Sequence, residues 1–326
     1  MKFYKIISKG LIIALAAVFL FCFLYFACYN EYNVRYSEGD AFAFAELNGK
    51  LYYCNNGKVY LYGEDVPVCK GNSIKAVGKY LAVNNSLVRN DELYLYNPES
   101  EEKVSIYKST FWDSLWAEDY VSSFFVKDLK VYYHVRRDYS YQGEIRCFDT
   151  ENKSNEILLK ETGVYSMTMD EDTGRLFLDK SNDVLVLDLA GKVTETLDVE
   201  LTDKDGGIFG LCADNRRLYV ETNDNFYVYN TDDLSQKPLV ISSSETLGRF
   251  YLLSAKGSAA YGVKYENGGT KLVLVSVNGK DGTVTEYGDC VFTEDILRVH
   301  TYRPTVIKQR LWYITDGEPM CTELKD

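Results

Sequence analysis

Short runs of alternating apolar and polar residues recur along most of the chain, separated by turns rich in Asn and Asp. The clearest example is residues 217–241, where 218–220, 226–229 and 238–241 are three such runs. β-branched and aromatic residues in short alternating runs favour strands over helices, and Asn and Asp between them favour tight turns. The pattern predicts three antiparallel strands of one small sheet. Pro238 suits an edge strand because proline lacks a backbone donor.

The same hairpin recurs at intervals of roughly 30 to 50 residues, a spacing typical of repeat architectures built from small sheets. One more apolar run precedes most hairpins, as in residues 207–213, and supplies an innermost strand. A lone sheet of this size cannot bury both faces, whereas a closed ring of sheets buries them against its neighbours. Equivalent hairpins are expected to begin near Leu51, Tyr80, Val131, Leu176, Leu218, Ala260 and Leu311.

The turn Phe148-Asp149-Thr150 has a hydrophobic-Asp-Thr pattern that is common in one group of repeat proteins. Over nearly everything after Asn30, the chain resembles the β-propeller repeats of the WD40-like, YVTN-like and quinoprotein-like superfamilies. The resemblance implies an all-β fold with seven four-stranded blades, with six or eight blades as alternatives. Regular Gly-His and Trp-Asp pairs are not seen, and neither is the tryptophan docking motif of quinone-binding enzymes. The likeness is therefore one of architecture, and no cofactor is expected.

Closure of such a ring depends on the two ends of the repeat region. The hairpin near Leu311 has no outermost strand after it, while residues 32–36 precede the first inner strand, expected at 41–46. We expect residues 32–36 to complete the last blade and to cover its exposed edge. The alternative is a short juxtamembrane linker.

Residues 11–28 form an uncharged apolar run that, as a helix, would span roughly 27 Å, close to the hydrocarbon thickness of a bilayer. Lys2, Lys5 and Lys9 precede it, so the positive-inside rule predicts a cytoplasmic N-terminus. The chain is thus divided into a cytoplasmic tail (1–10), a transmembrane signal-anchor helix (11–29) and an extracytoplasmic propeller (30–326), anchored in the cell membrane. A lipoprotein anchored at Cys28 and a cleaved signal peptide are the alternatives.

Composition narrows the range of partners. A hydrophobic content of 46% excludes a disordered chain, and the net charge is -12. The three lysines of the N-terminal segment contribute to that sum, so the remainder is more acidic still, at about -15. Such a surface repels phosphate backbones, and nucleic acid is not an expected partner.

Cysteine and acidic motifs give little support for a metal site. No cysteine pair has CxxC spacing, and the chain has only His134 and His300. Cysteines in strand-like runs are interpreted as small buried hydrophobes, with a Cys54–Cys69 disulfide as the alternative. Residues 170–174 resemble half of a calcium loop but lack the distal Glu, so an acidic turn is expected there.

In a four-stranded blade with strands a to d from inside to outside, the a–b and c–d turns share one end, called here the turn face. The b–c turns and the crossovers between blades share the other end, called here the crossover face. The turn face is expected to be acidic, and its acidic residues are Glu99, Glu101, Glu102, Glu151, Asp170, Glu171, Asp172, Asp232 and Asp233.

The crossover face should carry two long insertions, at residues 109–116 and 136–142. Exposed Trp, Tyr and Arg are the residue types that dominate binding hot spots. The alternative is that the aromatic residues plug the crossover and that the arginines belong to a solvated turn. The candidate ligand-binding residues are Trp112, Trp116, Arg136, Arg137, Tyr139 and Tyr141.

The sequence contains neither the GxSxG motif of serine hydrolases nor the GxxxxGK[ST] phosphate loop, so neither of these chemistries is expected. Two function classes remain. The favoured class is a membrane-tethered, non-catalytic binding module for an envelope protein, peptide or glycan, and not an enzyme. The alternative is a propeller enzyme of the glycosidase or metal-dependent lactonase type, using carboxylates near the inner strands at the central pore. Those carboxylates are Glu118, Asp119, Asp205, Glu245, Glu294 and Asp295.

Overall fold

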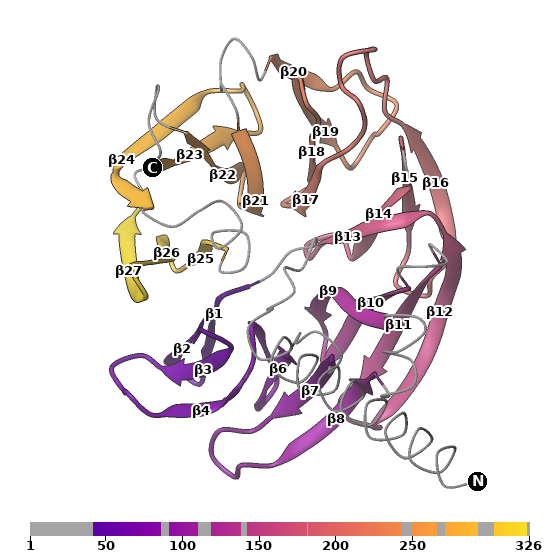
Figure 1. Cartoon of the computed structure of the whole chain (residues 1–326). Helices are drawn as coiled ribbons and strands as arrows, with labels where there is room; N and C mark the ends of the chain where they lie inside the picture. The colour runs from indigo at the N-terminus through magenta and orange to yellow at the C-terminus, as the bar shows by residue number, and fades with distance from the viewer. Residues whose placement is uncertain are drawn as a thin grey trace, which may run out of the picture.

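The computed structural model describes residues 42–85, 91–109, 119–137, 142–180, 182–242, 250–265, 271–292 and 303–324. Within these ranges the regular elements are strands, and they form seven separate antiparallel sheets. Figure 1 shows the sheets arranged radially around a central axis, with the first strand of each sheet innermost. The protein is a seven-bladed β-propeller, as the repeat predicted.

Each blade follows the chain from its inner to its outer strand, so consecutive strands are neighbours. Six blades have four strands and the seventh has three among the described residues. The blades are β1 (Phe44–Leu47), β2 (Lys50–Asn55), β3 (Lys58–Leu61) and β4 (Pro67–Lys70); β5 (Ser73–Val77), β6 (Tyr80–Asn85), β7 (Glu92–Tyr96) and β8 (Lys103–Lys108); β9 (Asp119–Lys127), β10 (Lys130–Arg137), β11 (Gln142–Asp149) and β12 (Ser154–Thr162); β13 (Val164–Asp170), β14 (Arg175–Lys180), β15 (Asp183–Leu187) and β16 (Val193–Asp198); β17 (Gly210–Asp214), β18 (Arg217–Glu221), β19 (Asn225–Asn230) and β20 (Leu239–Ser242); β21 (Phe250–Lys256), β22 (Ala259–Tyr265), β23 (Leu272–Asn278) and β24 (Val284–Phe292); and β25 (Thr305–Ile307), β26 (Arg310–Thr315) and β27 (Glu318–Glu323).

All seven predicted hairpin positions are confirmed, because each falls at or next to the first residue of a second strand, from β2 to β26. Tight inner turns make this regularity possible. Between β17 and β18 the whole turn is Asn215 and Arg216, with φ values of 49° and 62°. Two consecutive left-handed residues match the twist of a hairpin, which is why Asn-rich turns marked the repeat in the sequence.

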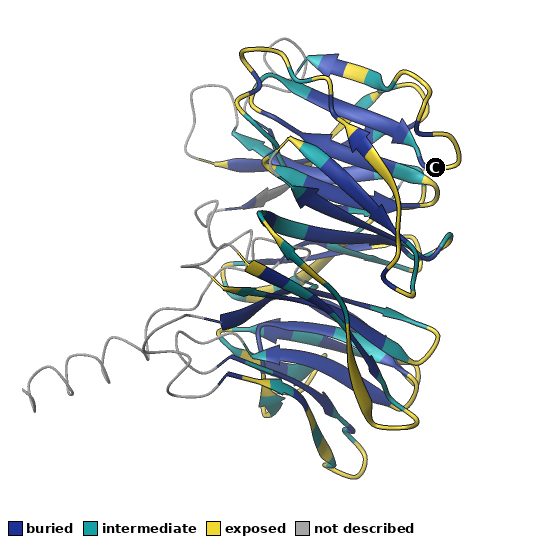
Figure 2. Cartoon of the chain, turned by 90° about the vertical axis from the view of Figure 1, so that its right-hand side faces the viewer, coloured by how far each residue is buried: buried dark blue, intermediate teal, exposed yellow. Residues whose placement is uncertain are grey.

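The hydrophobic core lies between blades and not within one sheet. Tyr132 and Ile145 of the third blade, for example, pack with Met167 and Leu178 of the fourth. Figure 2 shows buried residues along the strands in the interior and exposed residues mainly in the turns and outer strands. Each sheet buries both faces against its neighbours, which explains why aromatic and β-branched residues fill both faces of the inner strands.

Contacts between the first and last blades close the ring. The rings of Phe44 and Trp312 lie 6.0 Å apart, and Ile314 belongs to the same core cluster as β1 to β3. The Asn55 amide also donates to the carbonyl of Gly317 at 2.6 Å. Residues 32–36, predicted to complete the last blade, lie outside the described residues, so that prediction stands untested.

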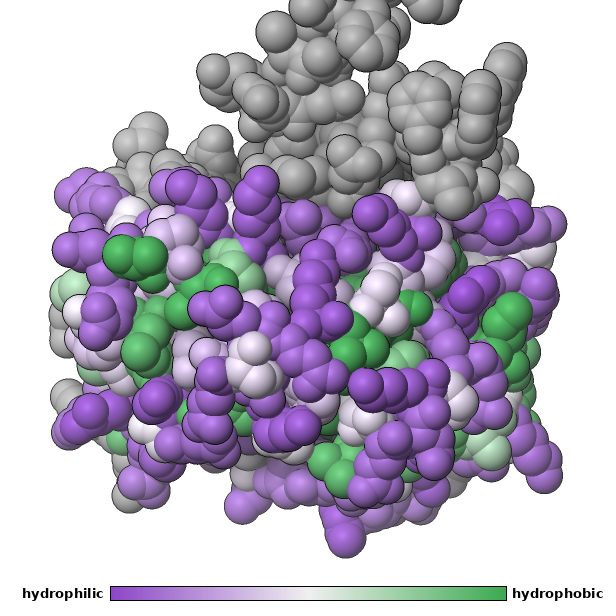
Figure 3. Space-filling model, turned by 90° about the horizontal axis from the view of Figure 1, so that it is seen from below, coloured by the Kyte–Doolittle hydropathy of each residue, from purple (hydrophilic) through white to green (hydrophobic). Residues whose placement is uncertain are grey.

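The described residues contain no helix with the length and apolar character needed to cross a bilayer. The predicted membrane segment, residues 11–28, is not among them. Figure 3 shows one face of the molecule, where polar side chains dominate and apolar ones are scattered.

The alternative of a disulfide within the first blade is wrong. Cys54 on β2 and Cys69 on β4 both pair with Val59 of β3, so a whole strand separates them. Two strand spacings amount to about 10 Å, beyond the reach of a disulfide. Both residues are free thiols, and Cys54, Cys147 and Cys212 are buried as small hydrophobic side chains, as expected.

Candidate functional site at the pore mouth

The inner strands surround a central cavity of about 250 Å³, lined by residues from all seven blades. Much of its wall is apolar, with Phe44, Val126, Met169 and Val306 among the lining residues. The charged lining residues Glu171, Asp214 and Lys256 lie where inner strands end at the turn face. This part of the cavity, together with Lys75, is called the pore mouth below.

Lys75 and Glu171 form the first ion pair of the pore mouth. Lys75 lies on β5 and its amine is 2.5 Å from a Glu171 carboxylate oxygen. The amine also lies 3.8 Å from the centre of the Phe42 ring, a cation–π contact. Attraction to Lys75 lowers the pKa of Glu171. Lys127, from the end of β9, donates to the backbone carbonyl of Glu171 and fixes the turn that carries it.

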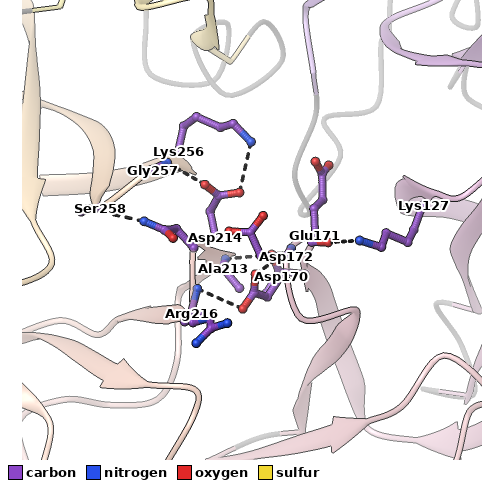
Figure 4. A network of polar contacts seen from close by, with 12 residues as sticks. Lys127, Asp170, Glu171, Asp172, Ala213, Asp214, Arg216, Lys256, Gly257 and Ser258 are labelled. Carbon is purple, nitrogen blue, oxygen red and sulfur yellow. Dashed lines mark hydrogen bonds and ion pairs between the residues drawn. The ribbon is translucent and has the colours of Figure 1, made fainter.

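Asp214 and Lys256 form the second pair, shown in Figure 4. Asp214 ends β17, and one carboxylate oxygen accepts the Gly257 N–H of the next blade at 2.6 Å. The other oxygen lies 3.3 Å from the Lys256 amine. Burial raises the pKa of Asp214 to about 6, although Lys256 and Gly257 oppose the shift. Burial disfavours the charged form of Lys256, but Asp214 and Glu171 outweigh it and raise its pKa.

Asp170 is the last residue of β13, as Asp214 is of β17, but its contacts are structural. It is fully buried, and its side chain accepts hydrogen bonds from the Arg216 N–H at 3.1 Å and the Thr231 hydroxyl at 3.2 Å, both in the next blade. It also accepts from Asp172 N–H and the Thr173 hydroxyl within its own turn. The predicted acidic turn is confirmed, and Asp170 lies at the turn face as expected. These donors hold its side chain inside the protein, so it adds no charge to the surface of that face.

Asp205, a candidate carboxylate of the enzyme alternative, is buried in the loop between β16 and β17. Burial opposes its charged form, but its many donors outweigh burial and lower its pKa to about 2. They tie the crossover loop to the β18–β19 hairpin, which is a structural task. The donors are Thr202 N–H and hydroxyl, both at 2.7 Å, the Thr222 hydroxyl, the Asn225 amide at 3.0 Å and the Tyr227 hydroxyl at 3.0 Å.

The other candidate carboxylates do not assemble into a site. Asp119 pairs with Arg137 at 3.0 Å, in a different blade from Asp205. In the part of the chain that the structure describes, no three His, Cys, Asp or Glu side chains are grouped as metal ligands. The remaining candidates lie outside the described residues, and they are Glu118, Glu245, Glu294 and Asp295.

A further buried carboxylate, Glu221 at the end of β18, lies toward the crossover face. Burial raises its pKa to about 8, against the opposing effects of the Leu252 N–H and Arg303. The Leu252 N–H donates to Glu221 at 2.7 Å and so links two blades. Gly210 lies opposite, and a Cβ there would lie 2.7 Å from a Glu221 oxygen and 3.1 Å from the Leu252 Cβ, so a larger residue would displace Glu221 or Leu252.

Of the predicted binding residues, Arg136 and Arg137 are described, whereas Trp112, Trp116, Tyr139 and Tyr141 lie outside the described residues. The Arg136 guanidinium lies 5.5 Å from the centre of the Tyr165 ring. Arg137 lines a second cavity of about 360 Å³ on the third blade. The two arginines therefore make structural contacts, and their role in binding stays a prediction.

The pore-mouth residues were missed as a site by sequence reasoning. The available signal was the position of charged residues within the repeat. The inner strands of four consecutive blades each end in a charged residue, namely Lys127, Asp170, Asp214 and Lys256. Only the curvature of the ring brings these positions together. Lys256 has one hydrogen-bond partner in the described structure, and a lysine amine has three donors. Glu171 uses one oxygen on Lys75, and its side chain is 38% exposed.

No protein-family model matches the chain, and no curated protein matches it closely. Solved structures match its fold. A chain of the mitotic checkpoint complex is 12% identical with a TM-score of 0.57, covering 88% of this chain and 91% of that one. Oligogalacturonate lyase in complex with manganese is 14% identical with a TM-score of 0.58, covering 88% of each chain. An acylaminoacyl peptidase of Pyrococcus horikoshii is 12% identical with a TM-score of 0.53, covering 78% of this chain and 45% of that one.

These similarities are to propellers in general and show the fold alone. They do correct one expectation from the sequence, that the protein is not an enzyme. The matched structures include a lyase and a peptidase as well as a checkpoint assembly. The fold is therefore no ground for excluding catalysis.

Proposed function

We propose that the protein is a membrane-anchored propeller that binds a small ligand with one anionic and one cationic group at its pore mouth. The observation that carries the proposal is the placement of Lys256 and Glu171 in one cavity, each with hydrogen-bonding capacity to spare. A cavity of about 250 Å³ is just below the roughly 300–1,000 Å³ of drug-sized sites, which favours a small molecule or the end of a chain.

The surroundings of the two groups support binding. Apolar residues form part of the wall, and beside them a charge of the ligand interacts somewhat more strongly than in open water. Asp214 pairs with Lys256, and Lys75 pairs with Glu171, so both groups are already held in place without a ligand. A preformed site costs less ordering entropy on binding.

The anchor follows from the sequence. Residues 11–28 have the length and apolarity of a membrane helix, and three lysines precede them. The chain runs along β1 toward the turn face. Because β1 begins at the crossover face, we place the bilayer on that side of the ring and the pore mouth on the side away from it. The ligand would then come from the cell envelope, either free or as part of a peptide.

The test uses the full chain in detergent and a graded series of ω-amino acids: glycine, β-alanine, 4-aminobutyrate and 6-aminohexanoate. The series keeps the two charges and varies their spacing, while succinate and putrescine carry charges of one sign. We expect at least one ω-amino acid to raise the thermal unfolding midpoint by several degrees at saturation. The controls with one sign of charge should do so less.

A matched pair of variants locates the effect. Lys256→Met should abolish the shift, and Lys280→Met, which changes an exposed lysine in the β23–β24 turn, should keep it. Absence of a shift with every ω-amino acid, or an equal shift in Lys256→Met, would contradict the proposed ligand site. The anchor is tested on cell membranes, from which alkaline carbonate should not extract the full chain but should extract residues 30–326.

A further inference from the structure

Asp214 differs from the other carboxylate of the pore mouth in how it is held. Its side chain is 8% exposed, whereas that of Glu171 is 38% exposed. The backbone N–H of Gly257 holds one oxygen firmly at 2.6 Å. The only other partner in the described structure is Lys256, at 3.3 Å, longer than the roughly 2.7–2.9 Å of a strong charge-assisted hydrogen bond.

The amine of Lys256 can reach an anionic group in the cavity as well as Asp214. Its side chain is 49% exposed and lines the cavity, and a lysine side chain is long and flexible. An anionic group entering the pore mouth would compete with Asp214 for the same amine. Two anions, the ligand group and the buried Asp214 carboxylate, would then share one cation. This arrangement favours protonation of one of the two anions.

The groups around Asp214 make it the one to be protonated. The charge of Lys75 lowers the pKa of Glu171, which favours the ionised form of Glu171. Burial already raises the pKa of Asp214 to about 6, close to neutral pH. The tyrosine hydroxyls nearby have raised pKa values and are neutral. The charged and titratable groups that face or neighbour Asp214 and its partner Lys256 include Lys256, Glu171, Asp172, Arg217, Tyr219 and Tyr261.

We propose that the anionic group of the ligand binds Lys256 and that Asp214 then takes up one proton from solvent, so that binding at the pore mouth is coupled to proton uptake. This inference rests on the proposed function and adds its regulation: the site binds more tightly as the surroundings acidify. The proton ends on the Asp214 carboxylate, and the Gly257 N–H continues to donate to the oxygen that is left unprotonated.

Isothermal titration calorimetry of the full chain in detergent tests the coupling, with each ω-amino acid of the series as the probe. Titrations at pH 7 in phosphate and in Tris, whose ionisation enthalpies differ, give the number of protons taken up. We expect uptake on the order of one proton per ligand. We also expect affinity to rise by up to about tenfold per pH unit between pH 8 and 6.

Asp214→Asn should bind without proton uptake and with pH-independent affinity, while Asp281→Asn, in the exposed β23–β24 turn, should behave as the unchanged protein. If Asp214→Asn does not fold, the titrations of the unchanged protein in the two buffers still show whether binding takes up a proton. Binding without proton uptake overturns this inference and leaves the proposed function standing. No binding by any ω-amino acid overturns both.

Discussion

Asp205 lies in the loop before β17 and Asp214 is the last residue of β17, and both carboxylates are buried. Their surroundings shift their pKa values in opposite directions. Donors around Asp205 outweigh burial and lower its pKa to about 2, whereas burial of Asp214 outweighs its donors and raises its pKa to about 6. The number of donors decides the difference. Asp205 accepts from four residues, whereas Asp214 accepts only from one backbone N–H and, at 3.3 Å, from one lysine.

The comparison teaches how to separate a structural carboxylate from a reactive one in a repeat protein. A buried carboxylate saturated with donors is part of the scaffold, because its charge is already compensated. The charge of a carboxylate that is buried with too few donors is poorly compensated, so this carboxylate tends to bind a proton or a cation. Such groups are common at functional sites. Asp205 was the candidate offered by the sequence, and Asp214 is the one favoured by the structure.

The largest expected effect is on stability at Asp205. Asp205→Ala removes the acceptor of five hydrogen bonds and leaves buried donors unsatisfied, so we expect the free energy of unfolding to fall by about 3 kcal/mol. Urea denaturation followed by tryptophan fluorescence measures it. Asp203→Ala, in the same loop but exposed, is the matched control and should change little. A loss at Asp205 no larger than at Asp203 would undo the comparison.

The next effect is a difference in the sign of pH dependence. The folded pKa of Asp205 is below its ordinary 3.8, so its stabilisation, about 2 kcal/mol, is present above pH 4 and is lost as pH falls toward 2. The folded pKa of Asp214 is above 3.8, so the folded protein binds the extra proton between pH 3.8 and 6. Stability therefore falls by up to about 3 kcal/mol as pH rises through that window.

Two variants isolate these contributions. The stability advantage of the unchanged protein over Asp205→Ala should shrink from pH 4 to pH 2. The stability of Asp214→Asn relative to the unchanged protein should increase from pH 4 to pH 7. Glu221 has a raised pKa as well, but it is common to both proteins and cancels in the difference. Parallel pH profiles for Asp214→Asn and the unchanged protein would mean that Asp214 ionises normally.

The smallest expected effect sharpens the role of Lys256. Because half of its side chain is exposed, the ion pair with Asp214 contributes little to folding, and Lys256→Met should change stability by less than about 1 kcal/mol. It should nevertheless raise the pKa of Asp214 above 6, because the lysine opposes the effect of burial. Carbon-13 NMR of the Asp214 carboxyl across pH 4 to 9 measures this. An unchanged pKa would show that the pair does not interact.

Sequence reasoning found the repeat because its signal is local. The alternation in residues 217–241 and the Asn-rich turns define each hairpin without reference to the rest of the chain, and every hairpin start near Leu51 to Leu311 was found. The carboxylates were assigned less well. Asp205 and Asp214 are both acidic residues beside an inner strand, and nothing in the local sequence distinguishes a carboxylate with five donors from one with two.

By itself, the sequence determined the strands and their order within each blade, since period-two alternation and turn chemistry depend on neighbouring residues. It favoured seven blades over six or eight, and the structure decided the number. Only the tertiary structure decided which charges share the pore mouth. Lys75, Glu171, Asp214 and Lys256 come from four different blades. The radial packing of the sheets sets their distances, and their burial and donors, hence their pKa values, depend on contacts between blades that the sequence pattern does not encode.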